Sequence, residues 1–513
     1  MTDHGDSPGR MPQFPEPYWR DSTELPSFER LTEDIETDTV IIGGGIAGIT
    51  AAYLLAKEGT KVVLLDASNI LNGTTGHTTA KITAQHGLIY EELISHFGED
   101  TARLYYEANN EAVQFLKNTV NKHKINCDFS EEDAYVYTNS SEYIQKLINE
   151  YKAYEKLGIS SEYLAEIPIP VEMKAAIVMK SQAQFHPLKY LTSLIDEIVQ
   201  DGGKIYDNTT AENIEKGKKP VVVTRDGNRL TCSNVIISSH FPFYDKTGGY
   251  FARMHAERSY VLAVKPEKQY PGGMYINAEQ PTRSLRSASI DGEQLILVGG
   301  EGHVTGHGIN TSEHYAALED FAEKTFGIKE IPYRWSAQDL ITLDKLPYIG
   351  NITDNNPNIL VATGFRKWGM TNGTVAALLL CDIIAGRKNK YEELFTPSRF
   401  NTDPSLKRLF SQNAEVAKSF IGGKLDHPDR KPEELNQDEG AVVMINGKRT
   451  GAYKDKNGEV HLVDRTCTHM GCELEWNNGE RTWDCPCHGS RFSYKGDVVE
   501  GPAVSPLKRI NIS

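Results

Sequence analysis

Two short cysteine–histidine boxes near the C-terminus constrain this chain more than any other feature. They read CTHMGC, which starts at Cys467, and CPCHGS, which starts at Cys485. Cys467 and His469 form C-x-H, Cys485 and His488 form C-x-x-H, and fifteen residues separate the two pairs. The segment therefore predicts two loops that each offer one thiolate and one imidazole to a shared centre. Such a ligand set suits either a [2Fe-2S] cluster or a tetrahedral zinc ion.

The two boxes resemble the cluster-binding boxes of Rieske proteins from the cytochrome bc1 and b6f complexes. In that family two cysteines bind one iron and two histidines bind the other. The resemblance gives these roles to Cys467, His469, Cys485 and His488. It also implies a disulfide between Cys472 and Cys487, and the sequence GPA at 501–503 resembles the proline loop that covers such a cluster. A disulfide is unusual in a reducing cytosol, although burial beside the cluster would protect it. Zinc stays open as the alternative for the same pairs.

The residues that follow His488 bear on the redox potential of such a cluster. Rieske proteins of the bc1 type have a serine two residues after the second histidine, which Ser490 matches. Their tyrosine two places further on is replaced here by Phe492. Each such hydroxyl donates a hydrogen bond to the cluster or to its cysteine and raises the potential. We therefore expect a potential below that of bc1-type centres.

A second motif follows Asp38: TVIIGGGIAGITAAYLLAKEGTKVVLLDAS, which starts at Thr39, has the pattern of strand, glycine turn, helix and strand. Gly43, Gly45 and Gly48 form G-x-G-x-x-G. The first glycine lets the chain turn sharply, the second lets the backbone approach a pyrophosphate, and the third lets the helix pack on the strand. Asp66 ends the second strand, where its carboxylate can accept hydrogen bonds from ribose hydroxyls. The pattern predicts a dinucleotide site.

Two further segments indicate which dinucleotide binds: GTTGHTTAKITAQHG (73–87) and NILVATGFRKWGMTNGTVAALLLCDII (358–384). With TLDKLPYIG before the second one, they resemble the D-amino-acid oxidase superfamily, flavoproteins that include glycine and sarcosine oxidases. This resemblance covers roughly residues 38–390 and implies FAD. A helix that begins near Thr371 would direct its N-terminal amides at the negative charge of a reduced flavin. The candidate flavin contacts in the two segments are Thr74, Thr75, His77, Gly364, Gly369, Met370 and Thr371.

Two residues in these segments have more specific expectations. His77 occupies a place that resembles the GSTWHAAG segment of dimethylglycine dehydrogenases, in which a histidine is bonded covalently to FAD. A histidine that only donates or accepts a hydrogen bond is the alternative. Family members that oxidise amino acids typically clamp the substrate carboxylate with an arginine, and Arg366 in GFRKWGM is the candidate for that catalytic role. A surface cation is the alternative for Arg366.

The order of expected elements predicts an α/β FAD-binding Rossmann-like domain with an inserted α+β substrate domain, followed by an all-β Rieske domain. A helical stretch is expected near 405–420. The predicted parts are an extended N-terminal arm at 1–36, a FAD-dependent oxidoreductase region at 37–415, a linker at 416–438 and the Rieske domain at 439–513. Within the oxidoreductase region, FAD-binding parts are expected at about 37–87, 180–250 and 335–390, and substrate-domain parts at about 88–179 and 251–334.

Charge and hydropathy exclude several classes of partner. The formal net charge of −15 argues against nucleic acid and anionic membrane surfaces. The N-terminus has no recognisable secretion signal, so a cytoplasmic location is expected. The longest apolar run, Val375 to Gly386, is shorter than the roughly 18–20 residues that a bilayer crossing needs, so no transmembrane segment is expected.

Two redox motifs in one chain predict an enzyme that converts a two-electron step into one-electron steps, because a flavin accepts a hydride whereas a [2Fe-2S] cluster carries one electron. We therefore expect an FAD-dependent dehydrogenase for a small-molecule reductant, an amine or amino acid. Its electrons would leave singly through the cluster to an unknown acceptor. The whole chain resembles bacterial FAD-dependent oxidoreductases with a C-terminal Rieske domain.

Three alternatives stay open. A reductase fed by NAD(P)H usually has a second nucleotide-binding unit, and the later glycine-rich candidate at 297–307 lacks a following helical pattern. An oxygenase would hold a mononuclear iron through Glu301, His303 and His307, although Rieske oxygenases place the cluster first in the chain. A non-catalytic redox sensor would bind both cofactors without turnover.

Overall fold

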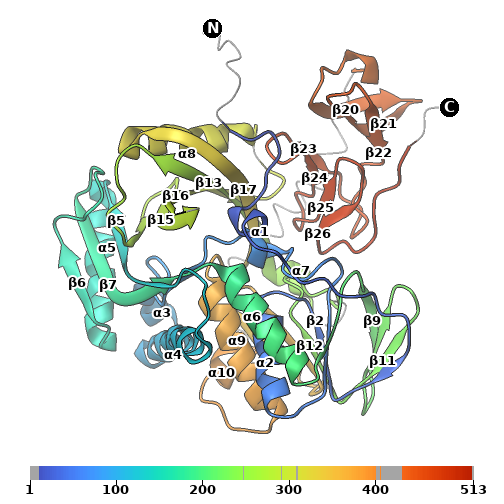
Figure 1. Cartoon of the computed structure of the whole chain (residues 1–513), viewed down its shortest axis with the longest axis horizontal. Helices are drawn as coiled ribbons and strands as arrows, with labels where there is room; N and C mark the ends of the chain where they lie inside the picture. The colour runs from blue at the N-terminus through green and yellow to red at the C-terminus, as the bar shows by residue number, and fades with distance from the viewer. Residues whose placement is uncertain are drawn as a thin grey trace.

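The computed structural model describes residues 11–245, 248–290, 292–307, 310–399, 405 and 430–510 (Figure 1). These residues form an α/β part, a second α+β part inserted into it, and an all-β part after residue 430. This arrangement confirms the predicted fold class. The expected helix near 405–420 and most of the expected linker at 416–438 lie outside the described residues.

A six-stranded sheet forms the centre of the α/β part. Its order is β18 (Tyr348–Asn351), β19 (Ile359–Thr363), β12 (Asn234–Ile237), β2 (Thr39–Ile42), β3 (Val62–Leu65) and β8 (Lys204–Tyr206). The strands are parallel except for β18, which runs antiparallel to β19. Every residue of β2, β3 and β19 is buried, which explains why these strands read as continuous apolar runs.

Both faces of this sheet are covered. The helices α2 (Ile46–Lys57), α6 (Pro187–Gln200) and α9 (Gly369–Ile384) pack together on one face. A small sheet packs on the other face, in the order β1 (Ile35–Glu36), β11 (Arg229–Thr231), β10 (Val221–Thr224) and β9 (Ala211–Glu215). The sheet is therefore the middle layer of three, and its carboxyl edge is the place where α2 and α9 begin.

The inserted part is built on a nine-stranded mixed sheet. Its order is β17 (Ile328–Thr342), β13 (Met254–Pro266), β16 (Glu293–Val304), β15 (Arg283–Ile290), β14 (Met274–Asn277), β5 (Ser130–Thr138), β7 (Ala175–Gln184) and β4 (Lys81–Ile82), with β6 (Ser161–Leu164) beside β7. The helices of this part are α3 (Tyr90–Phe97), α4 (Glu99–His123), α5 (Ser141–Leu157) and α8 (Ser312–Phe326).

The helix α8 corrects one expectation. The sequence pattern after 297–307 suggests no helix, yet α8 begins at Ser312 and packs its apolar side on β13 and β16. The segment is still no second dinucleotide unit, because β16 pairs antiparallel with both β13 and β15. A dinucleotide-binding βαβ unit requires a parallel neighbour.

The segment 11–36 has little regular structure apart from the short helix α1 (Tyr18–Asp21) and β1, but it packs into the body of the protein. The side chain of Trp19 is only 1% exposed, and its Nε1 donates to the carbonyl of Thr78 at 2.7 Å. β1 pairs with β11. In Figure 1 this dark blue segment runs between the other parts of the chain.

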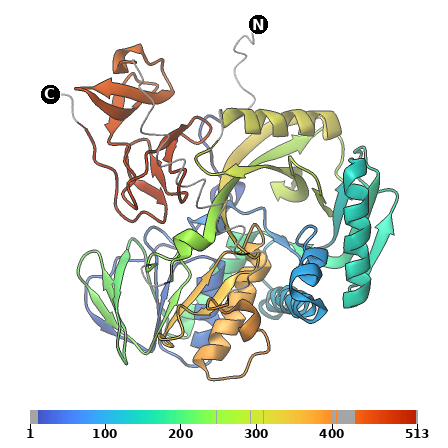
Figure 2. The same ribbon diagram turned by 180° about the vertical axis from the view of Figure 1, so that it is seen from behind.

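The C-terminal part consists of two antiparallel sheets. One contains β20 (Glu439–Ile445), β21 (Lys448–Lys454) and β22 (Val460–Val463), and the other contains β23 (Glu475–Asn477), β24 (Thr482–Asp484), β25 (Arg491–Ser493) and β26 (Val498–Glu500). Figures 1 and 2 show this red part beside β13, β17 and the short helix α7 (Tyr250–Arg253). The two cysteine–histidine boxes lie in the loops before β23 and between β24 and β25.

Buried ion pairs join the C-terminal part to β13. Arg258 is fully buried and donates to Glu500 at 2.7 Å, and Arg491 donates to the same carboxylate at 2.9 Å. Burial opposes ionisation of Glu500, but the charges of Arg258 and Arg491 outweigh it and hold the pKa of this carboxyl well below its usual range. Gln338 on β17 adds a hydrogen bond from its side chain to the carbonyl of Gly489 at 2.9 Å.

Replacement of Arg258 tests how strongly this contact stabilises the protein. We expect Arg258→Met to lower the free energy of unfolding by about 3 kcal/mol, because it removes one partner of a buried pair and leaves the other charge in the interior. Chemical denaturation followed by circular dichroism measures the change. The matched control is Arg229→Met, whose solvent-exposed pair with Glu215 should contribute far less to stability. Equal stability of the two variants would show that the buried pair does not hold the parts together.

Candidate functional site

The turn between β2 and α2 is shaped by its glycines. Gly43 has φ +112°, and a Cβ there would lie 2.5 Å from the carbonyl oxygen of Ser238 on the neighbouring chain segment. A Cβ on Gly48 would lie 2.0 Å from the carbonyl oxygen of Gly43. Gly45 is the N-cap of α2 and provides no side-chain cap. The N-terminal end of α2, where the helix dipole is positive, can therefore face an anion such as a pyrophosphate.

Asp66 and two threonines surround this turn. Asp66 accepts hydrogen bonds from the backbone amides of Gly44 and Ser68 at 2.8 and 2.9 Å, and burial raises its pKa. Thr75 accepts from the amide of Ile46 at 3.1 Å. Thr74 begins the 3-10 helix η1 (Thr74–His77), at the same rim.

His77 ends η1 and lies close to the C-terminal part. Its Nδ1 is 2.9 Å from the carbonyl oxygen of Gly73. Burial lowers the pKa of His77, which leaves the ring neutral at neutral pH. Covalent attachment of FAD at His77 stays a prediction, and the mass of the denatured protein would measure it.

The N-terminus of α9 forms the second wall of the site. Gly364 has φ +76°, and α9 then begins at Gly369, with Met370 and Thr371 buried in its first turn. The hydroxyl of Thr371 donates to the carbonyl of Thr83 at 3.2 Å and lies 3.1 Å from Nε2 of His86. The two predicted segments, 73–87 and 358–384, are therefore brought together.

Arg366 lies at this wall, in the turn before α9. Its Nη2 donates to the carbonyl of His86 at 2.8 Å. The backbone amide of Arg366 donates to Leu340 on β17 at 3.2 Å. These bonds hold Arg366 against the first flavin segment and against β17. Its role as a carboxylate clamp stays a prediction.

Sequence reasoning missed His240, which follows β12 at the carboxyl edge of the sheet. Its Nε2 is buried and has no hydrogen-bond partner among the described residues, and burial lowers its pKa. The preceding residues, Ser238 and Ser239, are the ones that approach Gly43. Its position just after the apolar strand at 234–237 could have indicated this residue from the sequence. An orphaned buried nitrogen at this rim fits a polar cofactor that completes the site.

The cysteine–histidine boxes converge in the C-terminal part. The interaction between the thiols of Cys467 and Cys485 lowers the pKa of Cys467 and raises that of Cys485. The rings of His469 and His488 lie 5.1 Å apart at 90°. Both Nδ1 atoms are buried without a partner among the described residues. Two thiols and two unpartnered ring nitrogens in one place fit a [2Fe-2S] centre with two cysteine and two histidine ligands.

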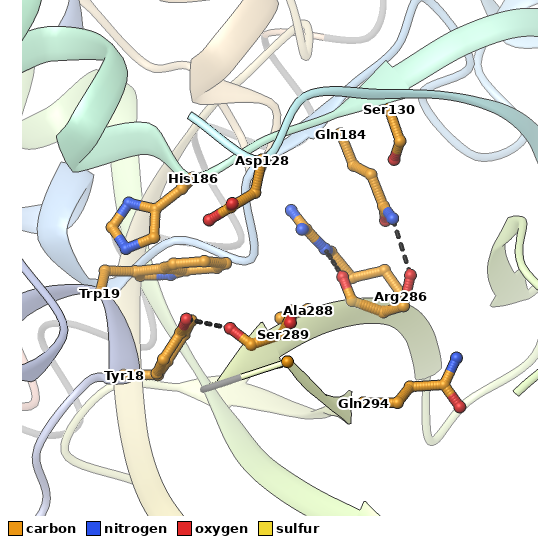
Figure 3. Close-up of a pocket in the computed structure, with 12 residues that line it drawn as sticks. Tyr18, Trp19, Asp128, Ser130, Gln184, His186, Arg286, Ala288, Ser289 and Gln294 are labelled. Carbon is orange, nitrogen blue, oxygen red and sulfur yellow. Dashed lines mark hydrogen bonds between the residues drawn. The ribbon is translucent and has the colours of Figure 1, made fainter. Parts of the chain in front are cut away.

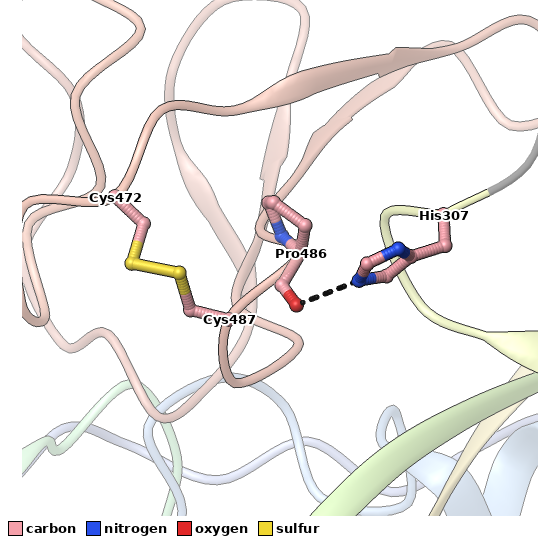
Figure 4. Close-up of a disulfide and its surroundings, with 4 residues drawn as sticks. All are labelled: His307, Cys472, Pro486 and Cys487. Carbon is pink, nitrogen blue, oxygen red and sulfur yellow. Dashed lines mark hydrogen bonds between the residues drawn. A yellow bond between two sulfur atoms is a disulfide. The ribbon is translucent and has the colours of Figure 1, made fainter. Parts of the chain in front are cut away.

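A disulfide ties the two boxes together. Cys472 and Cys487 are bonded, with their Cα atoms 6.5 Å apart, which confirms the predicted pairing (Figure 4). Beside it, the carbonyl oxygen of Pro486 lies 3.2 Å from Nε2 of His307. Glu301 forms an ion pair with Arg283 at 2.6 Å. His307 and Glu301 thus hold structural contacts, which removes the support for a mononuclear iron site there.

Ser490 is fully buried between the boxes. Its hydroxyl lies on the side of Cys467 and lowers the pKa of that thiol, and its oxygen accepts from the amide of Ala503 at 3.0 Å. Phe492, two residues on, is fully buried on β25 opposite Trp483. Of the two positions, Ser490 offers a hydroxyl to Cys467 and Phe492 offers none.

Known families match both parts of the chain. A family model described as FAD dependent oxidoreductase matches residues 38–383, and one described as Rieske [2Fe-2S] domain matches residues 427–511. The chain belongs to the FAD-dependent oxidoreductases and has a C-terminal Rieske domain.

Among its relatives, the oxidoreductase is 55% identical over 500 residues to "Putative Rieske 2Fe-2S iron-sulfur protein YhfW" of Bacillus subtilis (strain 168), with 98% of each chain covered. It is 24% identical to "Gamma-glutamylputrescine oxidoreductase" of Escherichia coli (strain K12), over 73% of this chain and 90% of the relative. The crystal structure of glycine oxidase from Geobacillus kaustophilus is similar in fold, with a TM-score of 0.59 and 16% identity, covering 71% of this chain and 99% of that one.

The family membership establishes FAD and a [2Fe-2S] cluster as the cofactors of the oxidoreductase, as predicted. The N-terminal ends of α2 and α9 and the orphaned nitrogen of His240 fit FAD, and the paired thiols and imidazoles fit the cluster. In the described part of the chain, no helix is both long and apolar enough to span a bilayer.

The hydroxyl of Ser490 provides a test of the cluster environment. Ser490→Ala should lower the midpoint potential of the cluster by on the order of 40 mV, since a hydrogen bond of about 1 kcal/mol corresponds to that shift in a one-electron couple. A redox titration followed by electron paramagnetic resonance (EPR) measures the potential. The control is Ser493→Ala three residues on, whose hydroxyl oxygen accepts from the amides of Lys495 and Asp497, so the potential should stay the same. A potential unchanged by Ser490→Ala would contradict the assigned hydrogen bond.

Proposed function

We propose that this oxidoreductase dehydrogenates an amine or amino acid and releases the two electrons one at a time to an external acceptor. FAD supplies the acceptance of a hydride, and the [2Fe-2S] cluster supplies one-electron transfer. Two relatives support the substrate class, because their names contain γ-glutamylputrescine, an amine, and glycine, an amino acid.

The position of the two cluster histidines, His469 and His488, best supports the transfer of single electrons out of the flavin through the cluster. The ring of His469 lies 6.3 Å from the ring of Phe241, and that of His488 lies 5.7 Å from Phe251. Phe241 belongs to the core cluster on one face of the six-stranded sheet, and Phe251 packs against the same cluster. Phe241 directly follows His240, at the same carboxyl edge as the glycine turn. The histidine side of the Rieske domain therefore faces the FAD domain.

Named residues of the chain would bind the flavin, orient the substrate and hold the cluster. Gly43, Gly45 and Gly48 would hold the pyrophosphate, and the amides at the start of α9 would face the flavin ring system. Arg366, fixed next to His86, is our candidate for orienting a substrate carboxylate. Cys467, His469, Cys485 and His488 would bind the cluster, with Ser490 as hydrogen-bond donor to Cys467.

Anaerobic titration of the purified protein tests the proposal. A panel of amines, amino acids and NAD(P)H is added in turn, while flavin absorbance and the Rieske EPR signal are followed together. We expect an amine or amino acid to bleach the flavin absorbance, and the EPR signal of the reduced cluster to appear afterwards. Bleaching by NAD(P)H alone would reverse the proposed direction of electron flow, and no bleaching by any member of the panel would favour a redox sensor.

Two variants test whether electrons leave the protein through the cluster. Cys485→Ser removes a proposed cluster ligand, so the flavin should still bleach while the EPR signal and the reduction of added cytochrome c are lost. Cys232→Ser changes another buried cysteine, one outside both sites, and should behave as the wild type. Undiminished cytochrome c reduction by Cys485→Ser would mean that electrons leave by another route.

A further inference from the structure

A cavity of about 280 Å³ lies beneath the N-terminal segment, away from the cysteine–histidine boxes (Figure 3). Tyr18 and Trp19 of α1 form one wall, and residues of β15 form another. Gln184 and His186 contribute the third side. The cavity is large enough for a molecule of a few carbon atoms, near the lower limit of small-ligand sites.

A buried arginine points into this cavity. Arg286 on β15 is 2% exposed, and its guanidinium lies 5.2 Å from the ring of Trp19. Its Nε donates to the carbonyl of Ser287 at 2.8 Å, and its Nη1 donates to the carbonyls of Thr79 and Ala80 at 2.9 and 2.8 Å. Nη1 also donates to the carbonyl of Phe185 at 3.2 Å, whereas Nη2 has no hydrogen-bond partner and the side chain forms no ion pair among the described residues. One donor group of a buried cation is thus left to the cavity.

The neighbouring groups do not neutralise this charge. Asp128 also lines the cavity, but its carboxylate accepts from Lys189 at 2.9 Å. Burial lowers the pKa of His186 to about 3, so this ring is neutral and lies 3.0 Å from the hydroxyl of Ser22. Burial lowers the pKa of Arg286 to about 9, which still leaves the guanidinium charged at neutral pH. A buried charge without an ionic partner is costly, and an anion in the cavity would remove that cost.

We propose that this cavity binds the carboxylate group of a small organic acid. Nη2 of Arg286 would donate to the carboxylate, a charge-assisted bond that is shorter and stronger than a neutral one. The apolar part of the acid would lie against the rings of Tyr18 and Trp19 and the methyl group of Ala288, all of which face the cavity in Figure 3. Two of the backbone carbonyls that Arg286 binds, those of Thr79 and Ala80, belong to the predicted flavin segment 73–87, so the acid would bind next to that segment.

Titration of the holoenzyme with sodium propionate and sodium benzoate tests the site, with sodium chloride at equal ionic strength as the blank. These acids have no amino group, so the result does not depend on the proposed oxidation of amines. We expect binding with a Kd of about 1 mM or below by calorimetry, and a change in tryptophan fluorescence that Trp19→Phe abolishes.

Two variants locate the binding. Ala288→Leu fills the cavity without removing a polar group and should weaken binding at least roughly tenfold, as should Arg286→Gln. Arg283→Gln changes an arginine on the same strand outside the cavity and should leave the Kd unchanged. The proposal is overturned if the wild type binds neither acid, or if a folded Ala288→Leu variant binds them with unchanged Kd and heat.

Discussion

The arrangement of the oxidoreductase depends on one buried charge. Arg258 lies on the inserted sheet, yet its carboxylate partner, Glu500, belongs to the last strand of the Rieske domain. Burying a guanidinium without a partner is costly, so the pair with Glu500 stabilises the contact between β13 and β26. Arg491 binds Glu500 from the Rieske side, in the strand that directly follows the second box. The same contact that satisfies the charge therefore fixes the orientation of the box relative to the FAD domain.

This orientation places the predicted cluster ligands against the α/β part of the chain, which would hold the flavin. His469 and His488 face Phe241 and Phe251, whereas Met470, the neighbour of His469, is about half exposed. A protein that transfers electrons needs its centres close to one another, and it also needs one accessible side for a partner. Under the proposed function, the histidines would meet the first need within the chain, and the exposed edge of the same loop would serve the second.

Much of the fold and of the site was predictable because local sequence determines it. Gly43 and Gly48 are required by backbone approaches that no side chain would permit, and the paired boxes contain their own ligand set. Other features depend on contacts between distant segments. His240 has no motif of its own and becomes notable only because β12 pairs with β2. Helix α8 was missed because its charged residues obscure a short apolar side, and the burial of Trp19 requires the inserted sheet beneath it.

The strand order of the central sheet also has a consequence for biosynthesis. β2 and β3 emerge first from the ribosome, but their sheet is completed only by β12 and then by β19, which ends at Thr363. Pairing between such distant strands is slow, and an unpaired β2 edge is a template for wrong association in the meantime. The Rieske strands pair instead with near neighbours in the chain and are translated last. We therefore expect chaperones to be needed most while the FAD domain is still incomplete and β2 has a free edge. The Rieske domain, which is translated after it, can dock onto an FAD domain whose sheet is already formed.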